Sequence, residues 1–580
     1  MSNFPWLTVA GAIPLVGAVA IALTPGRSAP GGPADRRARD LLVKRLALVF
    51  SLITLGVTIA MAVQYKTDGP RFQFTQTYQW IPQFGVHYAV GVDGIALVLI
   101  LMTVVLMPVV LLASWNDVEG VSPAAEPAAA ATGTARPPRQ PRLRSVKTYF
   151  VMMMVLETMM IGVFAATDVF LFYVFFEAML VPMYFMIGSF GVGQRQYAAV
   201  KFLLYSLLGG LLMLVAIIAL FVYSTHNGHP GTFLFVPLTH LVLSSTVQKW
   251  LFLGFFVAFA IKAPLWPFHT WLPDAATSAQ PGAAVLLVGV LDKVGTFGMI
   301  RYCLDLFPTA AHYFTGLIIT LAVIGVLYGA VVAIGQADMK RLIAYTSVSH
   351  MGLITLGIFA MTTQGQSGAT LYMVNHGFAT GALFLLAGFL VTRRGSNLIN
   401  DYGGVQKVAP VLAGLFLIAG LAGLSLPGLS TFVSEFLVLV GTFTRYEAAA
   451  VLATLGIILA AIYILWMYQR TMTGPVRAEV ANMPDLKPRE LWAVAPLIAL
   501  IIVLGIYPKP VLNIINPAVH STLVGTHTID PVPPHPTTPV SRVATAAKST
   551  AGKSGRGLAV AGKSTAGKSA VMKQKQGSSG

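Results

Sequence analysis

The chain has 580 residues, of which 56% are hydrophobic and 10% are charged, and its mean hydropathy is +0.74. Soluble globular proteins carry about 25% charged residues, and a single soluble core stops growing at ~250–300 residues. Here the apolar runs continue to residue 510 with only short polar breaks, which excludes a soluble enzyme and predicts a polytopic membrane protein. The net charge of +17 is spread over loops and the tail, which argues against a nucleic-acid-binding face.

A helix needs about 20 mostly apolar residues to cross a bilayer. The sequence predicts fourteen such spans, which begin near Phe4, Lys44, Gly94, Lys147, Val169, Gln196, Gln248, Pro281, His312, Met339, Gly368, Val408, Glu447 and Leu491. The expected fold class is therefore an all-α polytopic membrane protein. Because no basic residue precedes the first apolar run, this run is interpreted as a retained span and not as a cleaved signal peptide.

The basic residues of alternate loops predict the orientation. Before the tail, one set of loops holds only Lys66, Arg71, Lys249, Arg301 and Arg445, whereas the other set holds most of the loop Lys and Arg. The positive-inside rule places the richer set in the cytoplasm. Since the number of predicted spans is even, both termini are expected outside the cytoplasm.

Composition and span order divide the chain into six regions. They are spans one to three at 1–115, a flexible Ala-, Pro- and Arg-rich cytoplasmic insertion at 116–146, spans four to eight at 147–305, spans nine to thirteen at 306–471, the last span and its flanks at 472–520, and a disordered basic tail at 521–580.

Two overlapping stretches of the tail, Gly557–Ser564 and Gly562–Ser569, match the phosphate-loop pattern. A working phosphate loop needs a strand before it and a helix after it. Here a repeated AGKS sequence surrounds the pattern, which favours a disordered tail over a nucleotide site.

Several titratable residues fall well inside predicted spans, namely Glu157, Glu177, Lys262, Lys293, His350, His376 and Glu435. A charge at mid-bilayer costs ~2.5–3.5 kcal/mol even on the insertion scale, and such residues usually line an ion pathway. A single Lys–Glu pair could merely fix helix register, but charges on six or seven helices favour proton transport. Burial weakens the hold of an ammonium group on its proton and a nearby carboxylate strengthens it, so a movable carboxylate can drive proton transfer.

Two of the predicted spans are interrupted. The seventh is broken just beyond Lys262 and the twelfth just before Glu435, by Pro264, Pro267 and Pro273 and by Pro427 and Gly428 respectively. Proline removes a helix hydrogen bond, and open backbone at membrane depth is tolerated only against protein or water. Interruptions in two spans of opposite direction favour inverted repeats around a midplane site, with two unrelated proline kinks as the alternative.

Some residues have open or ordinary interpretations. His269 either relays protons or bonds to the backbone freed by the seventh-span break, and the pattern does not decide between these roles. A group of aspartates near predicted span ends is expected to form solvated helix caps: Asp168, Asp274, Asp292, Asp305 and Asp338. The single cysteine cannot close an intrachain disulfide or hold an iron–sulfur cluster, and no cofactor or metal site is expected in this chain.

Six stretches carry a resemblance to a known family: FFEAMLVPMY around Glu177, IKAPLWPFHTWLPDA around Lys262, LDKVGTFGMIR around Lys293, KRLIAYTSVSHMG around His350, NHGFATGALFLLAG around His376 and FVSEFL around Glu435. Over about residues 85–510 the chain resembles the antiporter-like membrane subunits of respiratory complex I. Subunit N of that family carries a lysine at the position of Glu435. Subunit L continues into a long lateral helix, whereas only a low-complexity tail is expected here after residue 510.

The resemblance implies two inverted five-helix repeats, at 147–305 and 306–471. It also implies a role for each titratable residue. Glu177 and Lys262 would form the input-side switch pair, with Lys293 as the central relay. His350 would connect the relay through water to the terminal group Glu435, and Glu157, His269 and His376 would be accessory.

The resemblance further implies a proton-translocating subunit of a bacterial NADH:quinone oxidoreductase in the cytoplasmic membrane. The flavin, the iron–sulfur clusters, NADH and quinone would be bound by partner subunits. Expected partners are the other membrane subunits of complex I, especially L and N, the NADH-oxidising arm indirectly and the lipid bilayer, with no nucleic acid. Two alternatives stay open: a subunit of a multisubunit sodium/proton antiporter, and a non-transporting scaffold whose buried charges specify assembly.

Overall fold

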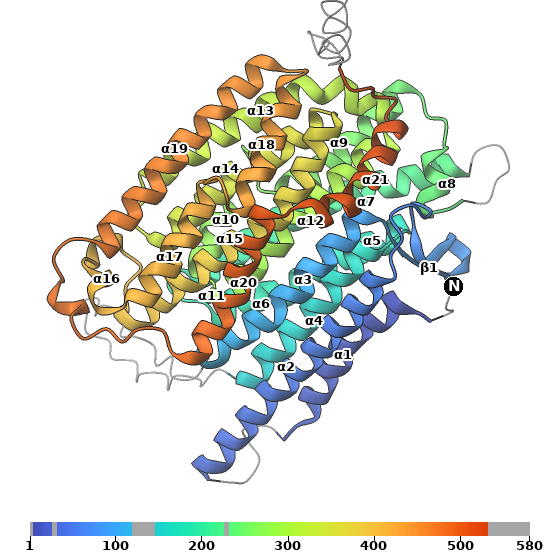
Figure 1. The fold of residues 1–580 in the computed structure, drawn as a ribbon. Coiled ribbons are helices and arrows are strands. Elements are labelled where there is room, and N and C mark those ends of the chain that lie inside the picture. Colours follow the sequence, from blue (N-terminus) through green and yellow to red (C-terminus); the bar gives the residue numbers. More distant parts are fainter. Residues whose placement is uncertain (1–3, 26–31, 119–144, 226–230, 532–580) are drawn as a thin grey trace, which may run out of the picture. The chain divides into compact units, whose positions relative to one another are not determined.

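The computed structural model describes residues 4–25, 32–118, 145–225 and 231–531, which are mostly helical (Figure 1). Up to the first broken span the helices are α1 (Trp6–Leu23), α2 (Pro33–Val63), η1 (Pro82–Phe84), α3 (Gly94–Ala113), η2 (Ser114–Asn116), α4 (Val146–Ala165), α5 (Val169–Ala178), α6 (Leu180–Phe190), α7 (Arg195–Ser224), α8 (Phe235–Thr239), α9 (Ser245–Lys262) and α10 (Trp271–Ser278). Most of the predicted 116–146 insertion and of the tail lies outside the described residues.

The eighth predicted span is built from α11 (Pro281–Leu286), the π-helical turn η4 (Leu287–Leu291), α12 (Asp292–Gly298) and a second π-helical turn, η5 (Met299–Leu304). The remaining helices are α13 (Pro308–Ile334), α14 (Met339–Phe359), α15 (Thr363–Arg394), η6 (Ile399–Asp401), α16 (Val405–Val408), α17 (Pro410–Gly423), α18 (Ser430–Phe443), α19 (Glu447–Met472), η7 (Ala478–Val480), α20 (Pro488–Ile506) and α21 (Lys509–Gly525).

Within the described ranges, 12 helical segments are long and apolar enough to cross a membrane. They correspond to twelve of the fourteen predicted spans, and the two others are the predicted broken ones. The seventh is split into α9 and α10, and the twelfth into the short apolar helices α17 and α18. The all-α membrane fold class is therefore confirmed, while the count of fourteen and the inverted repeats stay predictions.

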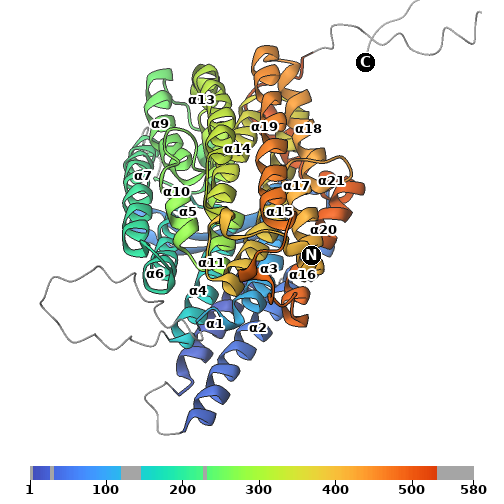
Figure 2. The same ribbon diagram turned by 90° about the vertical axis from the view of Figure 1, so that its left-hand side faces the viewer.

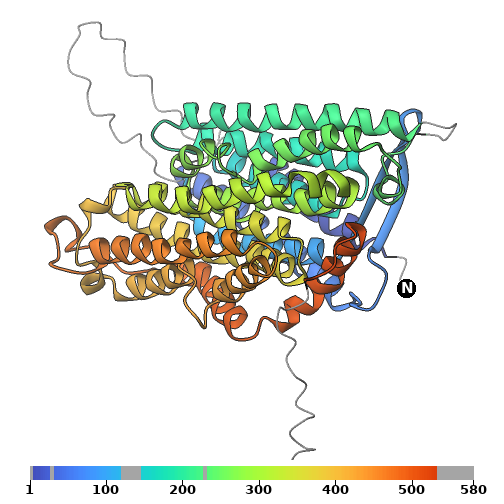
Figure 3. The same cartoon turned by 90° about the horizontal axis from the view of Figure 1, so that it is seen from above.

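A small β-hairpin is the exception to the helical pattern. Strands β1 (Gln73–Ile81) and β2 (Val86–Val92) pair antiparallel, with Tyr78 opposite Tyr88. The hydroxyl of Thr8, near the start of α1, lies 2.9 Å from the Tyr88 hydroxyl, and the Thr167 amide donates to the Ala89 carbonyl at 2.9 Å. The hairpin therefore lies against the helix ends at the α1 start and the α4–α5 connection (Figure 3).

The helices pack closely along two sets of neighbours. Helices α1 to α4 lie side by side (Figure 1), and α13, α14, α15, α18 and α19 form a second set (Figure 2). Glycines allow the close approach: a Cβ atom added at Gly329 would lie 2.7 Å from the Ser349 amide nitrogen, and one at Gly368 would lie 2.7 Å from that of Val438. Such small-residue contacts are typical of membrane helices. The eighth span, α14 and α15 are almost completely buried and form the centre.

The start of α1 and the whole of α21 lie at the hairpin end of the bundle. Arg71, which precedes β1, donates to the Thr522 hydroxyl of α21 at 3.2 Å, and His312 at the start of α13 lies 2.9 Å from the Thr526 carbonyl oxygen. Because the first and last described helices begin or end on one side, the described part of the chain agrees with an even number of crossings. Which side of the membrane it is stays a prediction.

Helix α21 corrects the expectation that only a low-complexity tail follows residue 510. Its buried residues recur at helical spacing, and it packs against α3 and α15. The predicted boundary at 521 falls inside this helix. A search for spans of about 20 apolar residues passes over α21 because it is short and one face is polar.

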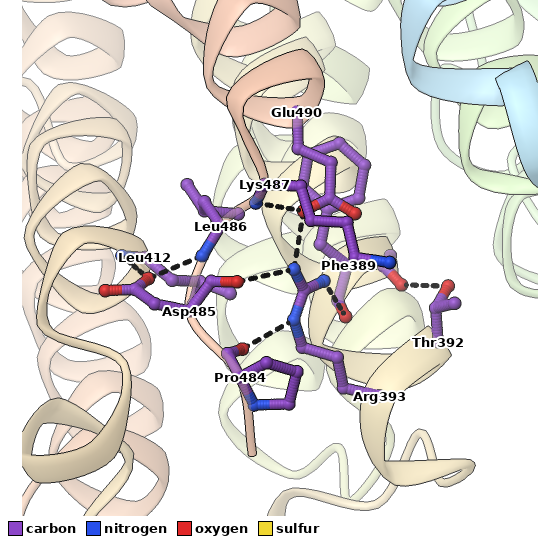
Figure 4. Close-up of polar contacts among 10 residues, drawn as sticks. Phe389, Thr392, Arg393, Leu412, Pro484, Asp485, Leu486, Lys487 and Glu490 are labelled. Carbon is purple, nitrogen blue, oxygen red and sulfur yellow. Dashed lines mark hydrogen bonds and ion pairs between the residues drawn. The ribbon is translucent and has the colours of Figure 1, made fainter.

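At the opposite end of the bundle, Arg393 joins α15 to the segment that leads into α20 (Figure 4). Its Nη2 pairs with Glu490 Oε2 at 2.5 Å, and its Nε donates to the Pro484 carbonyl at 2.8 Å. The neighbouring carboxylate of Asp485 accepts from the Leu412 amide at 3.0 Å and so caps the start of α17. The ends of α15, α17 and α20 are thereby tied together.

Replacing Arg393 by alanine is expected to lower the free energy of unfolding by ~3–5 kcal/mol, the cost of breaking a buried ion pair by removing one partner. The pair is buried, because the two side chains are 7% and 9% exposed. Thermal unfolding of the detergent-solubilised chain in its complex measures the effect. Arg394→Ala is the matched control, since the Arg394 Nε makes a 3.4 Å bond to the Asp401 carbonyl. Equal heat stability of the two variants would contradict the prediction.

Candidate functional site

The input-side pair predicted from the sequence lies between α5, α7 and α9. Lys262 is 1% exposed, and its Nζ has no hydrogen-bond partner among the described residues. This nitrogen lies 4.8 Å from the ring centroid of Phe176 and 5.9 Å from that of Phe202. Glu177 rests against Gly210 of α7, where any larger side chain would collide with its carboxylate. The two opposite charges are within electrostatic range of each other but form no direct hydrogen bond.

The position of Lys262 follows from the break after it. Pro264 cannot donate a backbone hydrogen bond, so α9 ends at Lys262. The carbonyl of Ile261 accepts instead from the Trp271 indole Nε1 at 2.9 Å, which satisfies the opened backbone at this depth. A cation in the last turn of a helix is favoured by the partial negative charge of the free carbonyls. The break therefore places a lysine at a helix end inside the bundle.

Lys293, the predicted central relay, lies on α12 directly after the π-helical turn η4 and is completely buried. Its Nζ lies 2.6 Å from the Val288 carbonyl oxygen, 2.9 Å from Asp292 Oδ1 and 2.5 Å from His376 Nδ1. The neighbouring Gly295 allows α12 to pack on the end of α9, since a Cβ atom there would lie 2.6 Å from the Ala263 amide nitrogen. The relay is thus directly beside the break that holds the input lysine.

Asp292 is the functional residue that the sequence analysis misplaced. The expectation of a solvated cap is wrong, because Asp292 lies near the middle of the eighth span, is 0% exposed and is ion-paired with Lys293. The signal that could have found it is two adjacent opposite charges inside an apolar run, in the stretch LVGVLDKVGTFG.

Two histidines continue from Lys293. His376 is on α15 and His350 on α14, and their ring centroids are 5.2 Å apart with the planes nearly perpendicular. His376 Nε2 and His350 Nδ1 have no hydrogen-bond partner among the described residues. The His350 ring lies 5.7 Å from that of Tyr372. Both imidazoles therefore keep a nitrogen available for a proton or a bridging water.

Glu435 forms the far end and is 5% exposed on α18. Its Oε2 accepts a hydrogen bond from Ser425, which lies in the break between α17 and α18 and has a left-handed φ of +61°. Thr431 donates to the Ala422 carbonyl freed by the same break. The Tyr372 hydroxyl lies beside the Glu435 carboxylate, and the Tyr372 ring lies 5.7 Å from the His350 ring. Tyr372 therefore contacts both Glu435 and His350.

The structure thus gathers six of the eight predicted site residues into one row, in the order Glu177, Lys262, Lys293, His376, His350 and Glu435. Glu177 is half-buried and the other five are buried. Two stand apart from these contacts. Glu157 is buried on α4, and neither carboxylate oxygen has a described hydrogen-bond partner. His269 is buried 5.0 Å from the Tyr328 ring. Neither of its ring nitrogens is bonded within the described residues, so of the two roles left open by the sequence, the bond to the freed backbone is not formed.

A second buried charge cluster lies near the hairpin end. Arg71 pairs with Asp305, whose side chain is 3% exposed, and Arg301 Nη2 lies 2.7 Å from Asp93 Oδ2. Burial raises the pKa of Asp305, against the lowering effect of the Arg71 and Arg301 charges. The expectation of a solvated cap is therefore wrong for Asp305 as well. This cluster has no signature in the sequence, because its members come from segments that lie far apart in the chain.

The three other aspartates differ in how far they match the expectation. Asp168 caps α5 but is completely buried, so its solvated character is wrong. Asp338 is half-buried and caps α14 by accepting from the Arg341 amide at 2.9 Å. Asp274 lies in the first turn of α10, and its carboxylate pairs with Lys201 at 2.8 Å and with Arg341 at 2.7 Å. Among the described residues no group of three or more His, Cys, Asp or Glu could hold a metal ion.

A helical membrane bundle with two broken spans and a row of carboxylates, lysines and histidines defines an ion-translocating membrane protein. The family model described as "NADH:quinone oxidoreductase/Mrp antiporter, TM" matches residues 166–462, a range that contains all of the row. The chain therefore belongs to the NADH:quinone oxidoreductase/Mrp antiporter family of transmembrane subunits.

Within this family the chain is similar to subunit M. It is 54% identical over 560 residues to NADH-quinone oxidoreductase subunit M of Mycobacterium tuberculosis, covering 94% of this chain and 99% of that protein. It is 39% identical to the subunit M of Rhodobacter capsulatus, covering 88% and 95%. A chain of respiratory complex I from Thermus thermophilus has the same fold, with a TM-score of 0.76, 31% identity, and coverage of 90% of this chain and 99% of that one.

Proposed function

We propose that this chain is a proton-translocating membrane subunit of an NADH:quinone oxidoreductase and carries protons along the row from Glu177 to Glu435. The observation that carries the proposal is the row itself, a series of titratable groups inside the bundle of a chain 54% identical to a subunit M. Groups of this kind at membrane depth are costly and mark proton relays in pumps and transporters.

The first step takes place at Glu177 and Lys262. The two charges are not in direct contact here, so a small movement of the Glu177 carboxylate changes how strongly Lys262 holds its proton. When the carboxylate is near, the ammonium form is favoured. When it moves away, the buried Lys262, surrounded by the Phe176 and Phe202 rings, is driven to give up its proton towards Lys293.

The later steps follow the contacts of the row. The proton on Lys293 Nζ passes to His376 Nδ1 across 2.5 Å. His350 then connects His376 to Glu435 through water, because no hydrogen bond joins the two rings among the described residues and His376 Nε2 and His350 Nδ1 both lack a partner. Glu435 holds the proton next to Ser425 before release. Glu157 and His269, buried without described partners, are accessory groups that feed this row.

The redox chemistry belongs to partner subunits in this proposal. NADH, flavin, iron–sulfur clusters and quinone are bound elsewhere in the complex, and this chain supplies only the proton path. Its neighbours are the other membrane subunits, especially L and N, in a bacterial cytoplasmic membrane. The start of α1 and α21 face the side away from the cytoplasm, as the distribution of basic loops predicts.

A subunit of a multisubunit sodium/proton antiporter is the second candidate, because the matched family includes Mrp antiporters. A scaffold whose charges only specify assembly is disfavoured by the row. A charge pair kept for assembly would be directly bonded, whereas Lys262 Nζ and Glu177 Oε1 have no hydrogen-bond partners among the described residues.

Gentle detergent purification of the chain from its native membranes, with its partners identified by mass, separates the two candidates. Copurification of flavin and iron–sulfur subunits with NADH–quinone reductase activity is the expected result. Small membrane subunits without a redox centre, together with sodium-dependent proton exchange, would contradict the proposal and assign the chain to an antiporter.

Deleting residues 541–580 is expected to leave proton pumping near the wild-type rate. The row ends at Glu435, and the deleted segment has a repeated, low-complexity sequence with no feature of a proton path. Proton uptake by vesicles that contain the truncated chain in its complex measures the effect. A large loss of pumping with an assembled complex would show that the tail takes part in transport.

A further inference from the structure

The two buried lysines of the row are held in different ways. Lys262 has no hydrogen-bond partner among the described residues, and its carboxylate partner Glu177 comes from another helix. Lys293 is ion-paired at 2.9 Å with Asp292, the residue directly before it on the same helix. Both members of this second pair are 0% exposed. The Asp292 carboxylate is therefore already in contact with its lysine, whereas the Glu177 carboxylate makes no direct bond to Lys262.

Lys293 is surrounded by several polar groups, of which Asp292 is the ion-paired carboxylate. Lys293 Nζ also contacts the Val288 carbonyl oxygen and His376 Nδ1. The elements packed around α12 are α4, α9, α14, η4 and η5. Away from their helix starts they carry Lys262, His350, Glu157, Arg301, Tyr302 and Cys303, and at the starts of α4, α9 and α14 they carry Lys147, Tyr149, Lys249, Lys340, Arg341 and Tyr345. Among the acidic groups of these elements, Asp292 alone is ion-paired with Lys293.

Resting on the proton-transport function proposed above, we infer that Asp292 is a positioning residue that serves as the fixed counter-ion of Lys293 and directs its proton to His376. In the transfer, the N–H bond of the Lys293 ammonium breaks and an N–H bond forms at His376 Nδ1. Asp292 stays ionised throughout and pairs with the ammonium again when the next proton arrives. The input pair is thus switched by a moving carboxylate, whereas the relay has a permanent one.

The consequence is a relay that stays protonated until His376 can accept. A fixed anion stabilises the ammonium form of Lys293 whatever the position of Glu177. Without Asp292, the buried lysine would be neutral over part of the working pH range and would have no proton to pass on. The loss would be largest at high pH, because the unpaired ammonium is the first form to disappear as the pH rises.

The test uses the intact complex in vesicles, with proton uptake measured across a pH series. Asp292→Asn keeps the shape and removes the charge, and it is expected to move the alkaline limb of the pumping profile to lower pH by ~1–3 units, the usual influence of one close opposite charge. Asp292→Glu restores the charge and is expected to return the profile towards wild type. Asp68→Asn, which changes an exposed carboxylate in the loop before β1, is the matched control.

Each result decides between the hypotheses. Wild-type pumping and pH profile in Asp292→Asn, together with no pumping in Lys293→Ala, would overturn the role of Asp292 and leave the proposed function standing. Normal pumping in Lys293→Ala would instead overturn the relay itself. If the Asp292→Asn complex does not assemble, the double variant Asp292→Asn/Lys293→Gln is compared. If neutralising both charges restores assembly, the result supports Asp292 as the counter-ion of Lys293. If the double variant also fails to assemble, the counter-ion role is overturned.

Discussion

Replacing Lys262 by alanine is expected to leave the complex assembled and to reduce proton pumping to near background. The buried Nζ of Lys262 makes no described hydrogen bond, so its removal breaks no hydrogen bond among the described residues. It does remove the proton carrier that faces Glu177 at the start of the row. Loss of a positioned acid–base group costs ~10²–10⁴-fold in rate.

The measurement is proton uptake by vesicles that hold the purified complex, normalised to the amount of assembled complex. Lys249→Ala is the matched control, because Lys249 lies on the same helix near its start, where its Nζ stacks 3.5 Å from the Tyr313 ring centroid. The control is expected to pump normally. Full pumping by an intact Lys262→Ala complex would remove Lys262 from the proton path and support a scaffold role.

The size of the switch is sufficient for the work required. Moving one charge against 100 mV costs ~2.3 kcal/mol, and a tenfold change in proton affinity corresponds to ~1.4 kcal/mol. A change of about two such steps at Lys262 covers the cost, and burial together with one movable opposite charge provides changes of this size. The open Glu177–Lys262 pair is therefore an energetically adequate input.

Replacing Glu435 by glutamine is expected to stop proton release at the far end of the row. Glutamine keeps the shape and can still accept the hydrogen bond from Ser425, so the break between α17 and α18 is retained. An amide cannot take up and release a proton at neutral pH. Protons that reach His350 would then have no acceptor, and pumping is expected to fall by ~10²-fold or more.

Proton uptake and NADH–quinone reductase activity of the same preparation measure this second effect. Glu447→Gln is the control, since Glu447 is exposed at the start of α19 and lies outside the row. A Glu435→Gln complex that pumps at the rate of the Glu447→Gln complex would contradict the terminal role. A complex that does not assemble would be compared with Glu435→Asp, which keeps the charge and must then restore assembly and pumping.

The sequence by itself determined the elements that depend on local composition. Apolar runs of helix length predicted the membrane fold, because a helix of that length crosses the bilayer and satisfies its own backbone hydrogen bonds there. Proline positions predicted the breaks after Lys262 and before Glu435, since a missing amide hydrogen is a property of the residue itself. Charges inside apolar runs predicted six members of the row, because their burial is costly wherever they pack.

Only the tertiary structure decided which of these groups meet. The contact of Lys293 with His376 joins α12 to α15, and a sequence pattern carries no record of which helix faces which. The sequence pattern placed Asp292 near a span end. Its complete burial became visible only when the eighth span was packed among its neighbours. The Arg71–Asp305 pair joins residues far apart in the chain, and α21 is held by packing on α3 and α15. Local propensity and hydropathy thus determined the helices and their breaks, whereas long-range packing determined the path that connects the charges.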